Sequence, residues 1–142
     1  MRERRAAREL VLQALYAQEL SDAPVSEVES YVIDESDLSE ELKEFARKLF
    51  RTSVYHKDEL DGYIKEKSLN WEFERIAVVD RLIMRMAICE FLYFDDIPPK
   101  VSISEAIEIA KKFSTENSSA FVNGILDAIL REIVGKGLIP EI

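Results

Sequence analysis

The stretch Ile76–Phe94, IAVVDRLIMRMAICEFLYF, decides the fold class of this chain. Only four of its nineteen residues are charged, namely Asp80, Arg81, Arg85 and Glu90. A helix that is apolar on nearly every side belongs in a protein core. Its uncharged runs are too short for a bilayer, which requires about 20 consecutive apolar residues. The stretch therefore predicts a buried helix around which the rest of the chain packs.

The segments on either side are amphipathic, and none of them shows strand-like alternation. Apolar residues recur at helical spacing in each of them, for example Ala7, Leu10, Val11 and Leu15 near the start of the chain. We expect helices over about 3–20, 26–34, 38–66, 76–94, 102–113 and 117–134. The segment 38–66 is either one long kinked helix or two helices with a break near 50–56. The fold is thus expected to be all-α, with about seven helices in two small helical bundles, 1–70 and 71–142, joined through a linker at 67–71.

Local signals suggest where some of these helices begin. Asp37 with Glu40, and Ser102 with Glu105, have the spacing of a capping box. Asn117 is placed to cap the final helix. Gly124 lies inside that helix, where glycine costs about 1 kcal/mol relative to alanine. We expect this glycine to permit the close approach of a neighbouring helix.

Composition excludes several classes of protein. The chain has 142 residues, a net charge of −9 and one cysteine, Cys89, so an internal disulfide is excluded and a reducing compartment is the simplest interpretation. Neither a signal peptide nor an apolar run of 18 residues is found, which favours a cytoplasmic protein without a membrane span. The only histidine, His56, cannot build a metal set or a catalytic triad. With no glycine-rich phosphate loop either, we expect no enzyme activity, no metal and no cofactor.

The N-terminus is the exception in this acidic chain. Its first eight residues, MRERRAAR, hold four arginines and one glutamate, a charge of +3 in a chain of −9. Arg4 and Arg5 precede Arg8 by four and three residues, so all three share a helix face. Cations in a first helical turn oppose the helix dipole, at a cost of roughly 0.3–1 kcal/mol each. Such a cluster favours an external anion, with RNA as the predicted ligand and Arg2 as an additional contact. The alternative is a solvated terminus.

Two further places offer binding groups. Tyr16 lies two helical turns beyond Arg8, where its ring either stacks on a base or packs at the edge of the core. Glu116, Asn117 and Ser118 form a polar turn before the final apolar segment. We expect this turn to be exposed and available to a protein partner.

Three stretches of the chain resemble the NusB family of bacterial transcription antitermination and ribosome-biogenesis factors. They are RRAARE (4–9) with QALY (13–16), the run from VDRL (79–82) to Glu90 and Phe91, and AIEIAKKF (106–113) continuing into ENS (116–118) and FVNGILD (121–127). The last stretch is the most specific of the three. The likeness covers nearly the whole chain.

The resemblance implies an all-helical protein of two subdomains without enzymatic activity. It further implies binding of boxA RNA, single-stranded, together with the ribosomal protein NusE, within a larger antitermination complex on RNA polymerase that suppresses premature termination in rRNA operons. By position, Arg4, Arg5 and Arg8 match the family's arginine-rich motif. Tyr16 and Phe121 match aromatic positions near the RNA, although Phe121 also fits the core stripe. Asp80 and Asn117 match positions that face NusE.

One position departs from the family pattern, since Ala120 stands where relatives often carry a lysine, so one phosphate contact is absent. The acidic remainder of the chain suits a basic ribosomal partner. Two other interpretations stay open at this point. One is an accessory RNA-binding helical domain that acts with an RNA-modifying enzyme. The other is a helical dimerisation module, since some relatives form homodimers.

Overall fold

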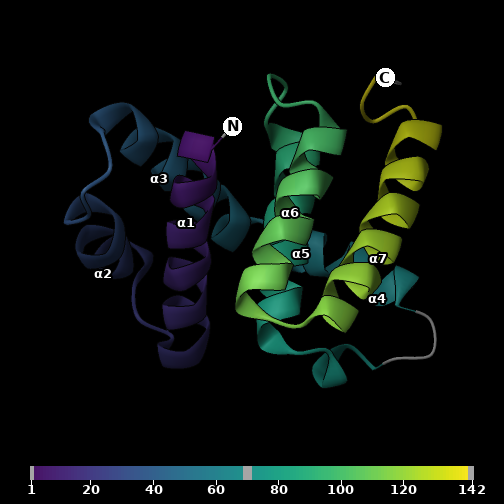
Figure 1. The fold of residues 1–142 in the computed structure, drawn as a ribbon, viewed down its shortest axis with the longest axis horizontal. Coiled ribbons are helices and arrows are strands. Elements are labelled where there is room, and N and C mark those ends of the chain that lie inside the picture. Colours follow the sequence, from purple (N-terminus) through teal and green to yellow (C-terminus); the bar gives the residue numbers. More distant parts are fainter. Residues whose placement is uncertain (1, 69–71, 141–142) are drawn as a thin grey trace. The chain divides into compact units, whose positions relative to one another are not determined.

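The computed structural model describes residues 2–68 and 72–140, and the side chains of residues 2 and 3 lie outside that description. Within these ranges the chain forms seven α-helices and no strand, which confirms the predicted all-α class (Figure 1). The helices are α1 (Arg2–Ser21), α2 (Val25–Val28), α3 (Glu40–Tyr55), α4 (Lys57–Lys67), α5 (Val78–Tyr93), α6 (Pro99–Phe113) and α7 (Glu116–Gly135). A π-helical turn, η1 (Glu29–Asp34), follows α2, and a 3₁₀ turn, η2 (Phe73–Arg75), precedes α5. No helix within the described ranges is long and apolar enough to cross a membrane.

The chain divides into two compact units at Tyr55 and His56, whereas the sequence placed the boundary near residue 70. The difference arises because α4 packs on α5 and α7 and so belongs to the C-terminal unit. Lys67 at the end of α4 also forms an ion pair with Glu132 of α7, at 2.7 Å. The predicted linker at 67–71 falls mostly outside the described residues. The N-terminal unit therefore consists of α1, α2, η1 and α3.

In the N-terminal unit, α1 packs on α3 and on η1. The apolar positions predicted for α1 are largely those that it buries, including Ala7, Val11, Ala14 and Leu15, none of which is more than 1% exposed. Helix α3 contributes Ala46, Leu49 and Phe50 to the same core. Spacings of three and four residues put these side chains on one face of each helix, which explains the packing.

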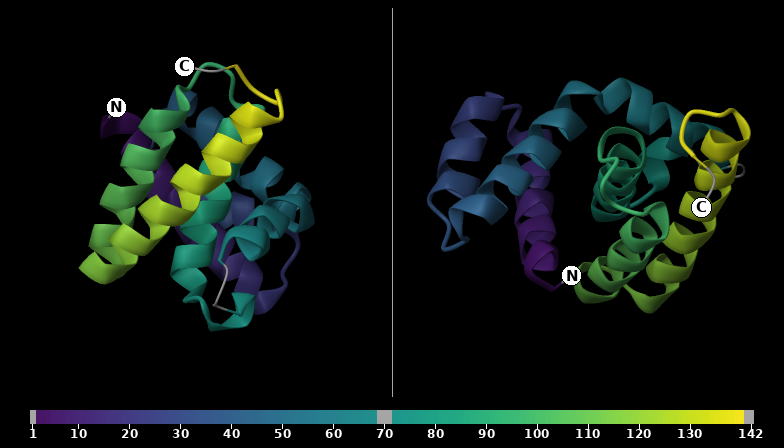
Figure 2. Two further views of the ribbon diagram at one scale, coloured as in Figure 1. Left: turned by 90° about the vertical axis from the view of Figure 1, so that its right-hand side faces the viewer. Right: turned by 90° about the horizontal axis from the view of Figure 1, so that it is seen from above.

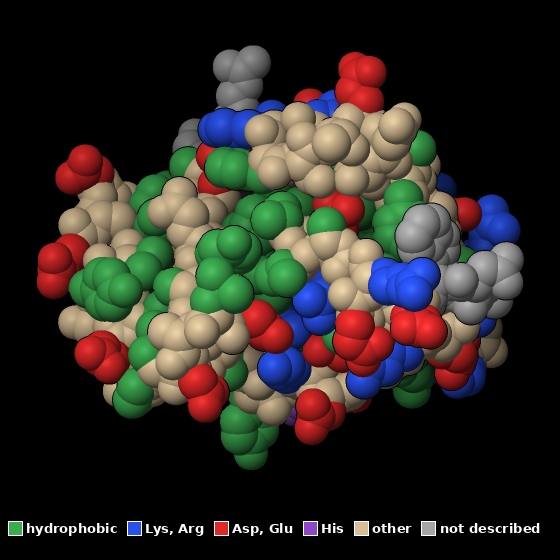
Figure 3. Space-filling view, turned by 90° about the horizontal axis from the view of Figure 1, so that it is seen from below, with side chains coloured by type: hydrophobic (Ala, Val, Ile, Leu, Met, Phe, Trp, Pro, Cys, Tyr) green, Lys and Arg blue, Asp and Glu red, His purple; other side chains and the backbone are tan. Residues whose placement is uncertain are grey.

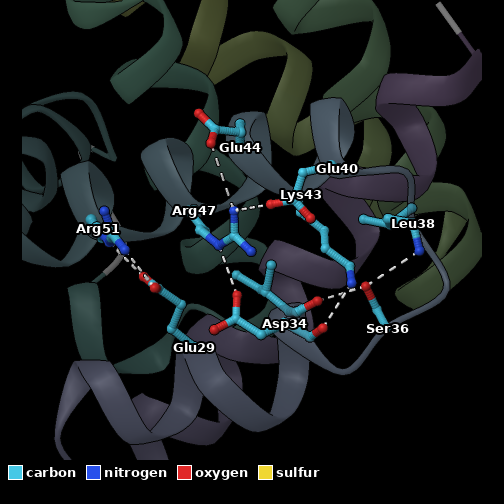
Figure 4. Close-up of polar contacts among 10 residues, drawn as sticks. Glu29, Asp34, Ser36, Leu38, Glu40, Lys43, Glu44, Arg47 and Arg51 are labelled. Carbon is cyan, nitrogen blue, oxygen red and sulfur yellow. Dashed lines mark hydrogen bonds and ion pairs between the residues drawn. The ribbon is translucent and has the colours of Figure 1, made fainter.

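Charged side chains fasten η1 to α3 in this unit (Figure 4). Arg51 donates two hydrogen bonds to the carboxylate of Glu29, each 2.6 Å long. Arg47 donates to Asp34 at 2.7 Å and to Glu40 at 3.0 Å. These hydrogen bonds are the largest cause that raises the pKa of the Arg47 guanidinium. Within this network the Arg51 side chain is 60% exposed, whereas Glu29 is buried.

Helix α5 is the centre of the C-terminal unit, as the opening stretch predicted. It contacts α4, α6 and α7, and its residues from Leu82 to Phe91 are all buried. The two views of Figure 2 show α6 and α7 side by side, connected by a short turn. Cys89 is fully buried in α5. The apolar character of this helix on every side is thus explained by neighbours on every side.

Two buried polar contacts connect α5 to its neighbours. Arg85 donates hydrogen bonds to both carboxylate oxygens of Asp61 of α4, at 2.9 and 3.0 Å. Ser102 of α6 donates to the buried Glu90 at 2.6 Å. The prediction that Ser102 and Glu105 start a helix is therefore wrong. Helix α6 begins three residues earlier at Pro99, a residue whose fixed backbone angle suits a first helical position.

Two other predicted helix starts and one glycine also need correction. Ser39, and not Asp37, accepts a hydrogen bond from the backbone of α3, from the Leu42 amide at 3.3 Å. Thr115, and not Asn117, caps α7 by accepting from the Ser118 amide at 3.0 Å. Both caps stand directly before the first helical residue, where side-chain oxygens reach free amides. Gly124 is exposed, and a Cβ atom added there would meet nothing within 4 Å, so the prediction of a close helix approach is wrong.

The segment 38–66 is two helices, with the break at His56. The His56 ring stacks on Tyr93 of α5 with their centroids 4.4 Å apart. Tyr93 donates a hydrogen bond to Glu59 at 2.5 Å, and this bond is the main cause that raises the pKa of Tyr93 to about 12. His56 is therefore held within the C-terminal unit at the start of α4.

Candidate functional site

The predicted RNA-binding residues of the N-terminal unit all lie on α1. Arg2 begins the helix, but its side chain lies outside the described residues. Arg4 and Arg5 are half-buried, Tyr16 is 42% exposed, and Arg8 is only 2% exposed. The three arginines therefore differ in how much of each side chain a ligand can reach.

Phe45 of α3 positions two of these arginines. The Cζ atom of Arg4 lies 4.5 Å from the centre of the Phe45 ring, and that of Arg8 lies 5.4 Å from it. The face of an aromatic ring attracts a guanidinium group at such distances. Sequence reasoning missed Phe45 because it fits the apolar stripe of α3 and nothing local marks it as a platform. Its ring fixes the direction in which Arg4 and Arg8 leave the helix.

Arg5 and Tyr16 form a second set on α1. They are eleven residues apart, which is close to three turns of 3.6 residues, so both lie along the same stripe of the helix. Their separation along the axis is roughly 16 Å at 1.5 Å per residue. A cation and an exposed aromatic ring aligned in this way suit an extended ligand with phosphates and bases. Of the α1 arginines whose side chains the structure describes, Arg5 is the one that is both partly exposed and aligned with Tyr16.

The predicted partner-binding residues come together in the C-terminal unit. A pocket of about 270 Å³ lies between the start of α5 and the first turns of α7. Its lining joins Asp80 to Asn117, Ser118 and Phe121. Residues from the predicted protein-binding and RNA-binding sets thus share one cavity. Glu116 is exposed in the first turn of α7 but does not line the pocket.

Asp80 is the most distinctive group in this pocket. The residue is 4% exposed, and its Oδ1 atom has no hydrogen-bond partner among the described residues. A buried carboxylate oxygen without a partner costs free energy, on the order of 1–3 kcal/mol or more. A ligand that donated a hydrogen bond there would remove that cost. The pocket is therefore suited to a donor group on an otherwise apolar side chain.

Three lining residues escaped the sequence analysis. Arg75, Ile76 and Ala77 connect η2 to α5 and form one wall of the pocket. Only their position next to Asp80 could have marked them, because nothing in their spacing resembles a binding motif. Among the described residues there is no group of three or more His, Cys, Asp or Glu side chains that could hold a metal ion.

Acidic side chains dominate the charge of the surface. In the face shown in Figure 3 they lie on both sides of the view, whereas lysines and arginines lie mainly toward its right half and its top. An acidic surface repels phosphate except where cations gather. The first eight residues carry a charge of +3 in a chain of −9, so the start of α1 differs in sign from the whole.

The described chain is thus all-helical, with an arginine-bearing helix in one unit and a pocket with a buried carboxylate in the other. The chain belongs to the NusB family, whose sequence model matches residues 5–131. It is 45% identical to the transcription antitermination protein NusB of Chloroherpeton thalassium over 97% of its own length. It spans 66% of the length of that relative.

Solved structures agree with this assignment. NusB of T. maritima is 39% identical and superposes with a TM-score of 0.86, covering 95% of each chain. A structure described as the antitermination factors NusB and NusE in complex with dsRNA is 28% identical, with a TM-score of 0.84. That match covers 93% of this chain and 98% of the other.

Proposed function

We propose that this chain is an RNA-binding transcription antitermination factor that works together with the ribosomal protein NusE. The observation that carries the proposal is the agreement between family membership and the two surfaces of the molecule. The arginines of α1 supply cations for an RNA backbone, and the Asp80 pocket supplies an acceptor for a basic protein. In this proposal the chain acts in the cytoplasm, on boxA RNA, and joins a larger assembly on RNA polymerase.

The RNA is contacted by Arg5 and Tyr16 along one stripe of α1, and Arg2 and Arg4 add cations at the start of the same helix. Arg8, at 2% exposure, acts mainly through its contact with Phe45. Phe121 contributes its ring from the pocket of the C-terminal unit. The structural relative crystallised with NusE holds dsRNA, whereas the composition of the α1 stripe favours unpaired bases. Both forms of RNA therefore belong in the test.

The test is a fluorescence anisotropy titration of a labelled boxA RNA, single-stranded or annealed to its complement, at several salt concentrations. Arg5→Ala should weaken binding and lower the salt slope by about 0.7 for the single strand or 0.9 for the duplex. Arg131→Ala is the matched control, because it removes the same charge from an exposed arginine of α7. If Arg5→Ala and Arg131→Ala both behave like the wild type, Arg5 does not contact the RNA backbone.

The NusE half of the proposal rests on Asp80. Asp80→Asn keeps the shape of the side chain and removes the charge. Losing a hydrogen bond to a charged group is worth roughly 1.5–3 kcal/mol, or about a tenfold to hundredfold weaker affinity for NusE. Calorimetry with purified NusE measures this, with Asp58→Asn, on the exposed face of α4, as the control of equal charge. If Asp80→Asn and Asp58→Asn bind NusE with equal affinity, Asp80 is not part of the partner interface.

A homodimer is the competing interpretation of this chain. Sedimentation velocity of the free protein over a hundredfold range of concentration distinguishes a monomer from a homodimer. In our proposal the protein that binds RNA and NusE is the monomer. A dimer that persisted after RNA was added would favour the dimerisation module instead.

A further inference from the structure

A cationic cluster lies in the C-terminal unit, where residues of α4, η2 and α5 meet around the ring of Phe73. The Nζ atom of Lys65 lies 4.9 Å from the centre of this ring, and the Cζ atom of Arg81 lies 4.8 Å from it. The two cationic groups are therefore within about 10 Å of each other. Neither cation belongs to α1 or lines the pocket that contains Asp80.

The charges of this cluster are not neutralised by the described part of the chain. No described carboxylate lies within 4.0 Å of Lys65 or Arg81, and the nearby carboxylate of Glu72 lies 3.9 Å from Arg75 instead. The ring of Phe73 attracts both cations, but it has no net charge and so cancels neither. Because like charges at this separation repel, an anion between them would stabilise the cluster.

Arg81 lacks hydrogen-bond acceptors as well. Its guanidinium donates to no other described residue, although its Nε atom is buried. Buried polar groups in proteins are nearly always hydrogen-bonded, and a charged group is costlier to leave unpaired than a neutral one. The residue as a whole is half-buried, so a ligand can approach it from the surface. A planar fork of N–H donors without an acceptor suits a phosphate, whose oxygens it binds in pairs.

The same arrangement occurs once in each unit. In the N-terminal unit the ring of Phe45 lies against two cations, Arg4 and Arg8, and in the C-terminal unit the ring of Phe73 lies against Lys65 and Arg81. Lysine and arginine side chains lose much rotamer freedom when a ligand orders them. Contact with a ring restricts them beforehand, so less freedom is lost on binding. Both clusters are thus prepared for an anion.

The turn η2 connects the cluster to the pocket that contains Phe121. Phe73 and Arg75 belong to this 3₁₀ turn and are roughly 4 Å apart along its axis, at 2.0 Å per residue. The side chain of Arg75 is 74% exposed, and the residue lines the pocket together with Phe121. A strand of RNA that contacts Phe121 is therefore followed by Arg75, and then by the cationic cluster.

We propose that Lys65 and Arg81, held by Phe73, form a second phosphate site for RNA. The two cations bind the backbone of the strand beyond the nucleotide that meets Phe121. The inference rests on the proposed function, because it takes RNA as the ligand. It deepens that function by extending the RNA contact to α4, η2 and α5, since cations beside an aromatic ring are typical of surfaces that follow a nucleic-acid strand.

The experiment is a fluorescence anisotropy titration of labelled single-stranded boxA RNA with the full chain at several salt concentrations. The double variant Lys65→Gln, Arg81→Gln should bind roughly tenfold more weakly near 0.1 M salt, with a salt slope smaller by about 1.4, or 0.7 for each phosphate contact. The matched control is Lys100→Gln, Arg131→Gln. It removes two exposed cations that line another cavity of the same unit, beside the C-terminal half of α7, and it should bind like the wild type.

Two further variants keep the test independent of the folding of the double variant. Lys65→Gln alone changes an exposed lysine and should still lower the salt slope by about 0.7. Phe73→Leu keeps both cations and removes the ring, so it should weaken binding and leave the slope unchanged. Circular dichroism of each variant verifies that its helices are retained.

Three outcomes would overturn the proposal. Lys65→Gln and the double variant could keep the wild-type slope, or the control could lose as much affinity as the double variant. Inorganic phosphate, at constant ionic strength, could raise the melting temperature of the wild type but not of the double variant, while both bind RNA equally. The cluster would then be a site for free phosphate.

Comparison with Arg5→Ala separates this proposal from the proposed function. If Arg5→Ala lowers the salt slope and the cluster variants do not, the second site is refuted and the binding of RNA by α1 stands. If the cluster variants lower the slope and Arg5→Ala does not, the second site is supported and the role of Arg5 is refuted. If the wild type does not bind the RNA at all, both proposals fail.

Discussion

The two units of the molecule differ in how deeply their arginine–carboxylate pairs are buried. In the N-terminal unit, Arg47 of α3 and Asp34 of η1 form an ion pair near the surface, with side chains 20% and 39% exposed. In the C-terminal unit, Arg85 and Asp61 meet inside the protein, with side chains 2% and 6% exposed. Exposed pairs contribute little and tolerate change, whereas a buried pair penalises every arrangement that separates it. The comparison indicates that the pairing of α4 with α5 is more strictly specified than the pairing of η1 with α3.

The largest expected effect tests this contrast directly. Asp61→Ala leaves the Arg85 charge buried without its carboxylate and should lower the free energy of unfolding by roughly 3–5 kcal/mol. Asp34→Ala, the corresponding change in the other unit, should cost about 1 kcal/mol or less. Urea denaturation followed by circular dichroism measures both. The double variant Asp61→Leu, Arg85→Met removes both charges and should recover much of the loss. Similar costs for the two single variants would contradict the contrast.

The helix caps provide a comparison of intermediate size. Thr115 caps α7 at 3.0 Å in one unit, and Ser39 caps α3 at 3.3 Å in the other. Each change to alanine should cost about 1 kcal/mol, since both remove the acceptor of a free helix amide. Asn117→Ala and Asp37→Ala, at the positions favoured by sequence, should each cost less than the neighbouring cap. Thermal unfolding resolves differences of this size, and the reverse order would restore the sequence-based caps.

A stabilising change is expected at Gly124. The site is helical and exposed, and an added Cβ atom meets nothing within 4 Å. Gly124→Ala should therefore raise the free energy of unfolding by up to about 1 kcal/mol. The same change at Gly137, whose φ is 73°, should destabilise because alanine disfavours that angle. Loss of stability at Gly124 would instead support the close helix contact predicted from sequence.

The smallest expected effect concerns acid stability. Hydrogen bonds from Lys67 and then Lys136 lower the pKa of Glu132 from its ordinary 4.5 to about 2. A carboxylate with a lowered pKa stabilises the fold above its ordinary pKa, and this stability disappears as the pH falls toward 2. Between pH 4.5 and 2, the wild type should therefore lose more stability than Glu132→Gln. Urea midpoints of the two proteins, measured between pH 4.5 and 2, test this. If the two midpoints fall in parallel, the ion pairs of Glu132 do not contribute to stability.

Local patterns in the sequence were sufficient for the helical class and for the buried position of α5. They failed where the deciding partner is distant in the chain. Ser102 looks like a cap because Glu105 follows at the right spacing, but its hydroxyl donates to Glu90 on another helix. The boundary near residue 70 failed for the same reason, since the contacts of α4 with α5 and α7 leave no local mark.

The candidate site shows the same limit. The arginines of α1 are visible in the sequence as a departure from the acidic average, but their unequal exposure depends on Phe45, from another helix. The resemblance to the NusB family related Asp80 to Asn117, two residues far apart in the chain. The shared pocket, and the wall formed by Arg75, Ile76 and Ala77, became visible only in three dimensions.

The burial of Cys89 has a practical consequence. It is the only thiol in the chain, and it lies at the centre of one unit with none of its surface exposed. A thiol reagent can modify it only when α5 separates from its neighbours, so the labelling rate measures the opening of the C-terminal unit alone. Cys89 is therefore a built-in probe of how often the C-terminal unit opens.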